Sequence, residues 1–246
     1  MNVYTSRHVH FAEVSSTMET ARTEATDHDF LLVTAESQTA GRGTRGRPWH
    51  SPLGNVYLTV AIHRRHLPAE RLKLFPLETG LALWEAVAPL LRPEARRGLR
   101  LKWPNDLLWE GRKTAGMLLE AAADHVFVGV GVNVAEAPEV ADGGTPSACL
   151  TEAGAADDCG LPIAKAFYEG LRARVTPVAA TLGATFSDAT DVLAEWRERA
   201  LWDKPLRLRD RPGRPQVVPI GINPEGHLRV RIPDGHEEDL ISEYLA

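Results

Sequence analysis

The 246-residue chain has 43% hydrophobic and 25% charged side chains, which is the composition of a globular protein with one large domain or a large domain and a small one. Its formal net charge of −5 argues against a surface built as a whole for nucleic acid. Two cysteines are too few for a disulfide framework, and no signal-like or eighteen-residue apolar run occurs, so we expect a cytoplasmic protein with no membrane partner.

The first structural signal is a helix start at Ser15–Arg22, SSTMETAR. Ser16 is placed as the N-cap, and Glu19, three residues on, is placed as the other half of a capping box. A helix N-terminus also offers free backbone N–H groups, so Ser16 and Thr17 are equally suited to bind a polar ligand. The sequence leaves both roles open.

Two predicted strands flank the segment between Gln38 and Trp49. Phe30–Ala35 is a short apolar run, and Asn55–Ile62 alternates with the period of a strand. Between them, QTAGRGTRGRPW alternates three glycines with three arginines. Taken alone, this run of charge favours a solvated loop or a nucleic-acid patch. Because glycine permits close backbone approach and guanidinium groups match carboxylate and phosphate oxygens, we also consider a cationic lid that becomes ordered over an anion.

A second polar cluster is predicted where a strand is broken. After a helix with an apolar stripe over Pro68–Leu91, the strand Leu99–Trp109 is interrupted by Pro104, and Asn105 and Asp106 follow the break. A tight turn at Glu110-Gly111 then brings Lys113 back beside this corner. Only five of the 28 basic residues are lysines, and Lys102 and Lys113 both lie here, which indicates that their geometry matters.

The predicted strand Val126–Val134 has two unlike faces. Its valines share one face, whereas Phe127, Gly129, Gly131 and Asn133 share the other. Glycine in a strand marks a place where something approaches the backbone closely. Either a flat ring system or a tightly packed helix fits, and the segment GVGVN lacks the third glycine of a dinucleotide-binding motif.

The rest of the chain predicts a loop and helices followed by a small β-rich tail. We expect a loop over Glu136–Thr145 and helices around 162–181 and 188–200. From Leu201 short β-like pieces are separated by turn signals near residues 211–213, 223–226 and 234–235. About 45 residues are near the lower limit for an independent core, so the tail should pack on the main domain.

The glycine-arginine loop, the KWPND corner followed by GRKTAGMLLE, and the GVGVN strand occur in that order. Together they resemble the biotin protein ligase (biotin–[acetyl-CoA-carboxylase] ligase) family over roughly residues 15–134. The resemblance implies an α+β fold, with a mixed sheet flanked by helices in a class II synthetase-like catalytic domain (1–200) and a small C-terminal SH3-like β-barrel (201–246). It implies the monofunctional kind without an N-terminal DNA-binding domain, and it allows a homodimer.

The resemblance also implies a reaction and its partners. The family joins the biotin carboxylate to the α-phosphate of ATP with Mg²⁺, and then passes biotin from biotinyl-5′-AMP to a lysine of the biotin carboxyl carrier protein of acetyl-CoA carboxylase or a similar carrier. The rival within the fold is a lipoate protein ligase. Rivals from other classes are a DNA-binding regulator, against which the charge balance weighs, and a non-catalytic biotin-binding module.

Site residues follow from the resemblance position by position. It implies that Lys113 and Arg42 are catalytic and that Asp106 contacts Mg²⁺. The implied biotin-binding residues are Ser16, Thr17, Gln38, Gly41, Arg42, Gly43, Thr44, Lys113, Gly116, Gly129 and Gly131. The implied nucleotide-binding residues are Arg45, Arg47, Trp49, Asn105, Asp106 and Asn133.

Two positions depart from the family pattern. Met18 stands where the family has asparagine, which removes an amide from the biotin side of the site. Thr44 stands where the second arginine of the loop is usual. We hypothesise that Arg45 or Arg47 covers the phosphate instead.

Overall fold

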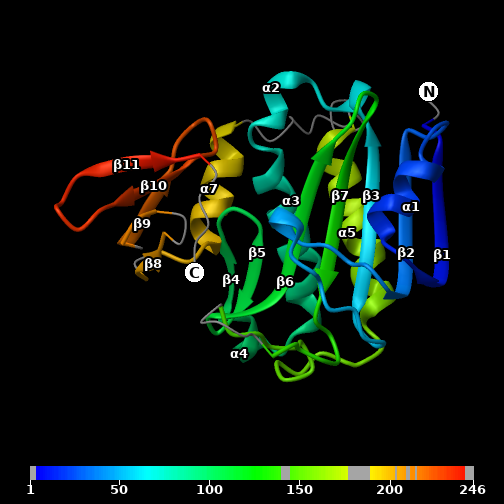
Figure 1. Ribbon diagram of the computed structural model, residues 1–246, viewed down its shortest axis with the longest axis horizontal. Helices are drawn as coiled ribbons and strands as arrows, with labels where there is room; N and C mark the ends of the chain where they lie inside the picture. The colour runs from blue at the N-terminus through cyan, green and yellow to red at the C-terminus, as the bar shows by residue number, and fades with distance from the viewer. Residues whose placement is uncertain are drawn as a thin grey trace.

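A seven-stranded mixed sheet forms the centre of the protein. The structure is a computed structural model that describes residues 4–139, 145–176, 189–202, 204–208, 211–213 and 215–241. The strand order is β1-β2-β3-β7-β6-β5-β4, with β1 parallel to β2 and the other pairs antiparallel (Figure 1). The strands are β1 (Ser6–Val14), β2 (Phe30–Gln38), β3 (Val56–His63), β4 (Leu99–Lys102), β5 (Asp106–Trp109), β6 (Arg112–Ala121) and β7 (His125–Val132). The expected mixed sheet flanked by helices is confirmed.

Helices cover the two faces of this sheet unequally. The short helix α1 (Thr17–Glu24) lies on one face, and α3 (Phe75–Val87) and α5 (Gly160–Val175) lie on the other (Figure 1). The larger core is formed between the sheet and α3 and α5, and it receives the valine face of β7. Because α1 is short, part of its face of the sheet is left for the site.

The predicted long helix over 68–91 is divided. It consists of α2 (Ala69–Leu72), α3 and a 3-10 turn at Ala88–Leu90. Pro76 lies in the first turn of α3, where its missing N–H is tolerated, and Pro89 coincides with the change to the 3-10 turn. The expected stripe is nevertheless in the core.

Two other predicted helices are present with different ends. The first is α5, which ends at Val175, and the part of its prediction beyond Thr176 lies outside the described residues. The second is α7 (Ala189–Arg199). Part of the loop predicted over Glu136–Thr145 also lies outside the described residues, and a short α4 (Pro93–Arg96) was not predicted. Among the described residues, no helix combines the length and apolar character needed to cross a membrane.

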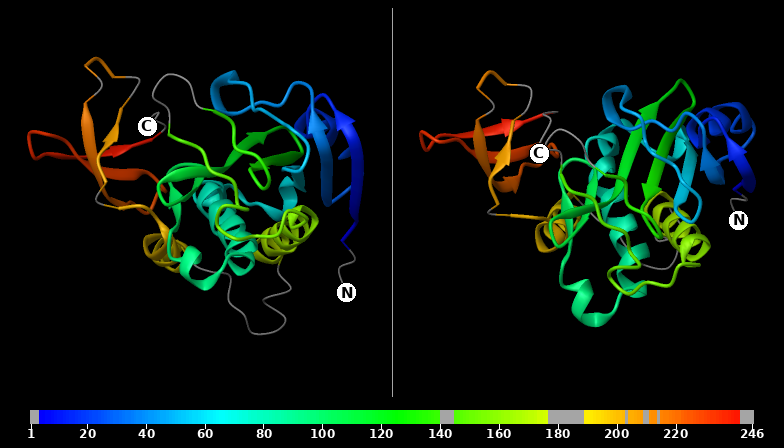
Figure 2. Two further views of the ribbon diagram at one scale, coloured as in Figure 1. Left: turned by 90° about the horizontal axis from the view of Figure 1, so that it is seen from below. Right: turned by 60° about the horizontal axis from the view of Figure 1, so that its bottom comes forward.

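The tail forms a separate four-stranded antiparallel sheet in the order β11-β10-β9-β8, at the end of the molecule next to α7 (Figure 2). Its strands are β8 (Leu206–Arg207), β9 (Gln216–Ile222), β10 (Leu228–Arg231) and β11 (Glu237–Leu240). The first three were predicted, whereas β11 was missed because EEDL contains one apolar residue. Leu228, Val230 and Leu240 join the main core, so the expected packing of the tail on the main domain is confirmed.

A buried carboxylate stabilises the start of β2. Asp29 accepts hydrogen bonds from the backbone N–H of Thr5 at 3.0 Å and from Nε of Arg65 at 2.6 Å, and it lies 2.6 Å from Nε2 of His66. Burial alone would raise the pKa of Asp29, but the hydrogen bonds from His66, Arg65 and Thr5 outweigh it and hold the pKa well below its usual range. The ionised form therefore stabilises the fold.

Candidate active site

A cavity of about 530 Å³ lies on the face of the sheet that α1 leaves open. Its walls come from the N-terminal turn of α1, the connection between β2 and β3, the corner before β5, and strands β6 and β7. The predicted site residues that line it are Ser16, Thr17, Gln38, Arg42, Gly43, Thr44, Arg47, Trp49, Asn105, Asp106, Lys113, Gly116, Gly129, Gly131 and Asn133. Residues that are distant in sequence are thus brought to one cavity.

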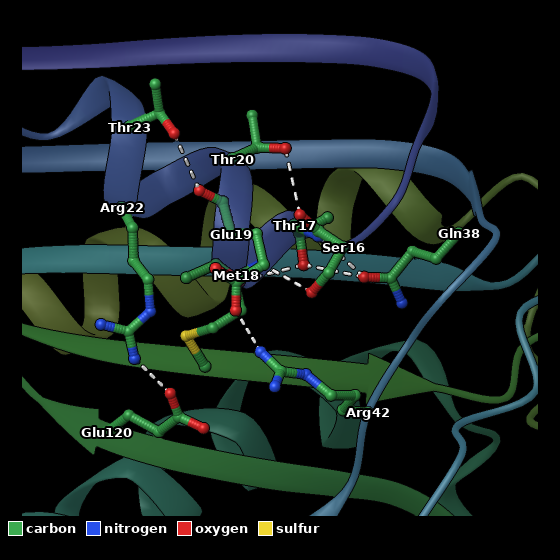
Figure 3. A network of polar contacts seen from close by, with 11 residues as sticks. Ser16, Thr17, Met18, Glu19, Thr20, Arg22, Thr23, Gln38, Arg42 and Glu120 are labelled. Atoms are coloured by element: carbon green, nitrogen blue, oxygen red, sulfur yellow. Dashed lines mark hydrogen bonds and ion pairs between the residues drawn. The ribbon is translucent and has the colours of Figure 1, made fainter. Parts of the chain in front are cut away.

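The N-terminal turn of α1 forms a polar wall. Ser16 is the N-cap, and its hydroxyl accepts from the backbone N–H of Met18 at 3.2 Å. Gln38 Oε1 accepts from the backbone N–H of Thr17 at 2.9 Å (Figure 3). The hydroxyl of Thr59 donates to that of Thr17 at 3.0 Å. The N-cap role of Ser16 is confirmed, and because Ser16 and Thr17 also line the cavity, their role in binding a polar ligand stays a prediction.

The capping box that we predicted with Glu19 is wrong. The carboxylate of Glu19 forms an ion pair with the guanidinium of Arg42, which belongs to the loop across the cavity (Figure 3). Ser16 bonds to the second N–H of the helix and not to that of Glu19. A capping box is a local pattern, and here a long-range partner has taken its acidic member.

The glycine-arginine loop folds back on itself as a narrow hairpin. The backbone N–H of Gly43 donates to the carbonyl of Arg47 at 2.7 Å, and that of Trp49 donates to Gly41 at 2.8 Å. Its tip is a 3-10 turn at Thr44–Gly46 in which Arg45 has a φ of 60°. This hairpin brings the cationic part of the loop over the cavity.

Two predicted residues of this loop do not line the cavity. Gly41 is buried beneath the loop, where a Cβ atom would lie within 2.9 Å of Gln38, Trp49 and Ser51 atoms. Arg45 is exposed at the hairpin tip. Of the two arginines proposed to replace the missing one, the geometry favours Arg47, which lines the cavity and donates to Thr44 Oγ1 at 3.3 Å.

The opposite wall is the polar corner at the break between β4 and β5. The ammonium group of Lys113 lies 2.6 Å from Oδ1 of Asp106, so the expected return of the hairpin is confirmed. The turn has φ values of 51° at Glu110 and 78° at Gly111, which suit a tight hairpin. Asn105 is fixed by donating from Nδ2 to the carbonyl of Met117 at 2.6 Å.

Lys102 and Asn133 hold the segment that enters the cavity after residue 144. Lys102 is only 4% exposed, and its ammonium group donates to the hydroxyl of Thr145 at 3.0 Å. The side-chain amide of Asn133 donates to the carbonyls of Lys113 and Ala148, each at 3.4 Å. These contacts join the ends of β6 and β7 to the neighbouring loop.

The glycine face of β7 is covered by two side chains from different elements. A Cβ on Gly131 would lie 2.4 Å from the indole of Trp49, and one on Gly129 would lie 2.9 Å from the methyl group of Met18. Gly116 on β6 is also under Trp49. Met18 comes from α1, so the helix-packing alternative is confirmed at Gly129, whereas the floor for a flat ring at Gly131 stays a prediction, because Trp49 of the lid-like loop covers that position.

The charge arrangement can bind an anion but does not by itself hold a metal. Arg42, Arg47 and Lys113 line the cavity, and the ammonium of Lys113 lies 5.3 Å from the ring centre of Trp49. Within the described ranges no group of three or more His, Cys, Asp or Glu side chains is arranged to hold a metal ion. Asp106 is thus a single carboxylate beside a lysine, which suits a Mg²⁺ ion only if phosphate oxygens complete its shell.

Sequence reasoning missed part of the lining. The residues missed are Pro48, His50, Thr59, Met117, Leu118, Val130, Pro138, Glu139, Thr145 and Ser147, while Met18 was noted only as a departure. Thr59 could have been found, because strand alternation places it on the glycine side, where it pairs with Gly129. The loop residues Pro138, Glu139, Thr145 and Ser147 carry no such periodic signal.

Comparison with known proteins adds an independent result. Residues 11–133 match the model of the Biotin/lipoate A/B protein ligase family. The biotin--[acetyl-CoA-carboxylase] ligase of Mycobacterium tuberculosis is 40% identical over 207 residues, which are 82% of this chain and 73% of that protein. The biotin--[acetyl-CoA-carboxylase] ligase of Paracoccus denitrificans is 39% identical over 146 residues, covering 51% of this chain and 59% of that protein.

Solved structures agree with the fold. The biotin protein ligase from Leishmania major in complex with biotin superposes with a TM-score of 0.69 at 30% identity, covering 97% of this chain and 99% of that one. The biotin protein ligase from Aquifex aeolicus in complex with biotin and ATP has a TM-score of 0.74 at 22% identity, covering 98% and 97%. The second likeness concerns the fold alone.

Proposed function

Because the chain belongs to the Biotin/lipoate A/B protein ligase family, we propose that it is an ATP-dependent ligase that activates biotin as biotinyl-5′-AMP and transfers it to a lysine of a biotin carboxyl carrier domain. The observation that carries the proposal is the single cavity that combines a glycine floor, a cationic loop and the pair of Lys113 with Asp106. These are the features needed to bring a carboxylate to a triphosphate.

The biotin half of the site is assigned to the α1 side of the cavity. Ser16, Thr17 and Gln38 offer hydroxyl and amide groups to a polar ring edge. Gly116, Gly129 and Gly131 have no side chains of their own, and a flat bicyclic ring would lie on this backbone beside or in place of the Trp49 and Met18 side chains that now cover it. Arg42, Gly43 and Thr44 line the same cavity from the loop. Gly41 contributes by letting the loop pack closely against Gln38 and Ser51.

The activation step needs cations around two anions. An oxygen of the biotin carboxylate attacks the α-phosphorus of ATP, a new C–O–P linkage forms, and pyrophosphate leaves with the electrons of the broken P–O bond. In this proposal Lys113 balances the negative charge between the two reactants, and its ammonium group is paired with Asp106 at 2.6 Å. Arg42 and Arg47 add positive charge from the loop.

The nucleotide half is assigned to the corner and the loop. Asn105 and Asp106 line the cavity at the break between β4 and β5, and Trp49 supplies an aromatic surface. Asn133 supports this half by fixing the backbone at Lys113. Asp106 would hold Mg²⁺ together with phosphate oxygens, and the ion would neutralise charge on the leaving pyrophosphate. Arg45 is given a lesser role because it does not line the cavity, unlike Arg42 and Arg47.

The transfer step completes the cycle without a covalent enzyme intermediate. The amine of the carrier lysine attacks the acyl carbon of the adenylate, the amide bond forms, and AMP leaves. We also propose that residues 1–200 form the class II synthetase-like catalytic domain and residues 201–246 form a small SH3-like domain. The four antiparallel strands of the tail support the second assignment.

The experiment is ATP–pyrophosphate exchange with biotin or lipoate, followed by a separate assay in which labelled biotin is transferred to a purified biotin carboxyl carrier domain. We expect exchange and transfer that depend on biotin and on Mg²⁺. Equal or greater exchange with lipoate would replace the proposal with a lipoate ligase, since the family model covers both substrates. Biotin binding with no exchange would reduce the protein to a binding module.

A further inference from the structure

The ion pair between Glu19 and Arg42 joins two parts of the site that are otherwise separate. Glu19 lies in the first turn of α1, next to the residues that line the biotin half, and Arg42 lies in the cationic loop. Figure 3 shows the carboxylate of Glu19 directed to the guanidinium of Arg42 and not to the start of its own helix. Glu19, which was expected to cap its own helix, therefore pairs with a residue of the cationic loop instead.

The helix that carries Glu19 is well anchored. Thr17 is bonded to Gln38 and Thr59, and Arg22 forms an ion pair with Glu120 on β6. The guanidinium of Arg22 also lies 4.9 Å from the ring centre of Phe127 on β7. With both ends of its inner face tied to the sheet, α1 holds the carboxylate of Glu19 at a fixed place beside the cavity.

Among the described residues, the loop that carries Arg42 has few ties to the rest of the protein near its tip, and Trp49 packs on Gly131 and Gly116 at its far end. The backbone bonds from Gly43 to Arg47 and from Trp49 to Gly41 are internal to the hairpin. The pair with Glu19 uses Nη2 of Arg42, and a guanidinium has further N–H groups that can still bind an anion. Glu19 can thus orient Arg42 without consuming it.

We propose that Glu19 is a positioning residue that acts through Arg42 to keep the cationic loop closed over the bound acyl-adenylate. This inference rests on the proposed function and extends it to a residue outside the cavity lining. Both side chains are about half exposed, at 50% for Glu19 and 46% for Arg42. The contribution is therefore that of a surface ion pair, and we expect about a two- to fivefold effect on loop closure.

The test is the rate at which the activated intermediate escapes, measured as biotin label on a bystander protein such as serum albumin, in single-turnover reactions with preformed adenylate. Glu19→Ala should raise this rate about two- to fivefold, and Glu19→Gln, which keeps the acceptor oxygen, should raise it less. Added salt should accelerate escape from the wild type but have little further effect on Glu19→Ala, because salt screens the pair.

The matched control is Glu24→Ala. Glu24 lies at the other end of α1 and pairs with Arg7 at 2.9 Å, with comparable exposure of 33% and 47%. If Glu19 served only to stabilise the helix, Glu19→Ala and Glu24→Ala would change the melting temperature and the rate of adenylate escape to the same extent. The inference is overturned if the two variants have the same escape rate.

A double-mutant cycle separates action through Arg42 from any other role. In the Arg42→Ala background, Glu19→Ala should have no additional effect on escape. A full additional effect in that background would also overturn the inference. Absence of biotin-dependent pyrophosphate exchange in the wild type would instead refute the proposed function, so the two failures are distinguishable.

Discussion

Gly131→Ala is the substitution for which the structure gives the clearest expectation. The added Cβ would lie 2.4, 2.5 and 2.7 Å from three atoms of the Trp49 indole. Ordinary contacts between such atoms are about 3.5–4.0 Å, so one partner must move by about 1 Å or more. Strand β7 is paired on both sides, by β3 and β6, whereas Trp49 belongs to a loop, and we therefore expect the loop to move.

The size of the effect follows from the cost of overpacking. Fitting an extra methyl group into a packed site costs about 1–3 kcal/mol. If this free-energy cost destabilises the closed position of the loop, the population of the closed loop falls by about 5- to 150-fold relative to the open loop. The kcat/KM for biotin-dependent pyrophosphate exchange should fall by the same factor, while the melting temperature changes little because the sheet is kept.

Two other glycines provide an internal scale. Gly129→Ala meets the end of the flexible Met18 side chain at 2.9 Å, so its effect should be smaller. Gly221→Ala lies in β9, where a Cβ meets nothing within 4 Å, so activity should be unchanged. The reasoning is refuted if Gly131→Ala retains wild-type kcat/KM, or if Gly221→Ala impairs exchange as strongly.

Three further predictions use the same exchange assay or thermal unfolding. Lys113→Ala should lower kcat for exchange about 100-fold, whereas Lys165→Ala, at an exposed position on α5, should leave kcat unchanged. Full activity of Lys113→Ala would show that Lys113 takes no part in adenylate formation. Arg47→Ala should raise the KM for ATP about tenfold, and Arg45→Ala should leave it unchanged. A higher KM in Arg45→Ala than in Arg47→Ala would indicate that Arg45 binds the phosphate. Asp29→Asn should lower the melting temperature at pH 7 by about 5 °C, from about 2 kcal/mol of lost charged hydrogen bonds. The pKa of Asp29 is lower in the folded protein than the unfolded value of about 4, so the ionised carboxylate stabilises the fold fully above pH 4 and this stabilisation is lost as the pH falls below 4. The melting temperature of Asp29→Asn should therefore fall less between pH 5 and pH 3 than that of the wild type, and an equal fall in the two proteins would contradict this reasoning.

The parts of the site that sequence predicts well are those fixed by local geometry. The two faces of β7 follow from alternation along one strand, and the approach of Lys113 to Asp106 follows from one tight turn. Both depend on residues fewer than ten positions apart. Such contacts need no knowledge of how distant elements pack.

The parts that sequence does not predict depend on packing between elements. The covering of Gly129 by Met18 and the pairing of Glu19 with Arg42 require the position of α1 relative to the sheet and the loop. The burial of Gly41 likewise reflects how the loop turns back on Gln38 and Ser51. Glu19 shows the physical reason most directly, because a local cap and a distant arginine compete for one carboxylate, and only the folded chain decides between them.

The corner that carries Asn105 and Asp106 is supported from the tail as well as from the main sheet. The indole N–H of Trp103, two residues before Asn105, donates to the carbonyl of Gly226 at 3.0 Å. Gly226 has a φ of 84°, and a Cβ there would lie 2.8 Å from the carbonyl oxygen of Lys73, so this turn admits only glycine at so close an approach.

Strand β4 is tied to the start of the tail at the same time, because the backbone N–H of Leu201 donates to the carbonyl of Leu101 at 2.8 Å. Leu101 and Trp103 thus bind the tail just before the chain reaches Asn105 and Asp106. We therefore expect that loosening the tail would displace Asp106, the carboxylate that pairs with Lys113, before other parts of the site. The small sheet contributes no residue to the described cavity lining, but its turn at Gly226 is bonded to Trp103, which lies two residues before the corner proposed to bind the nucleotide.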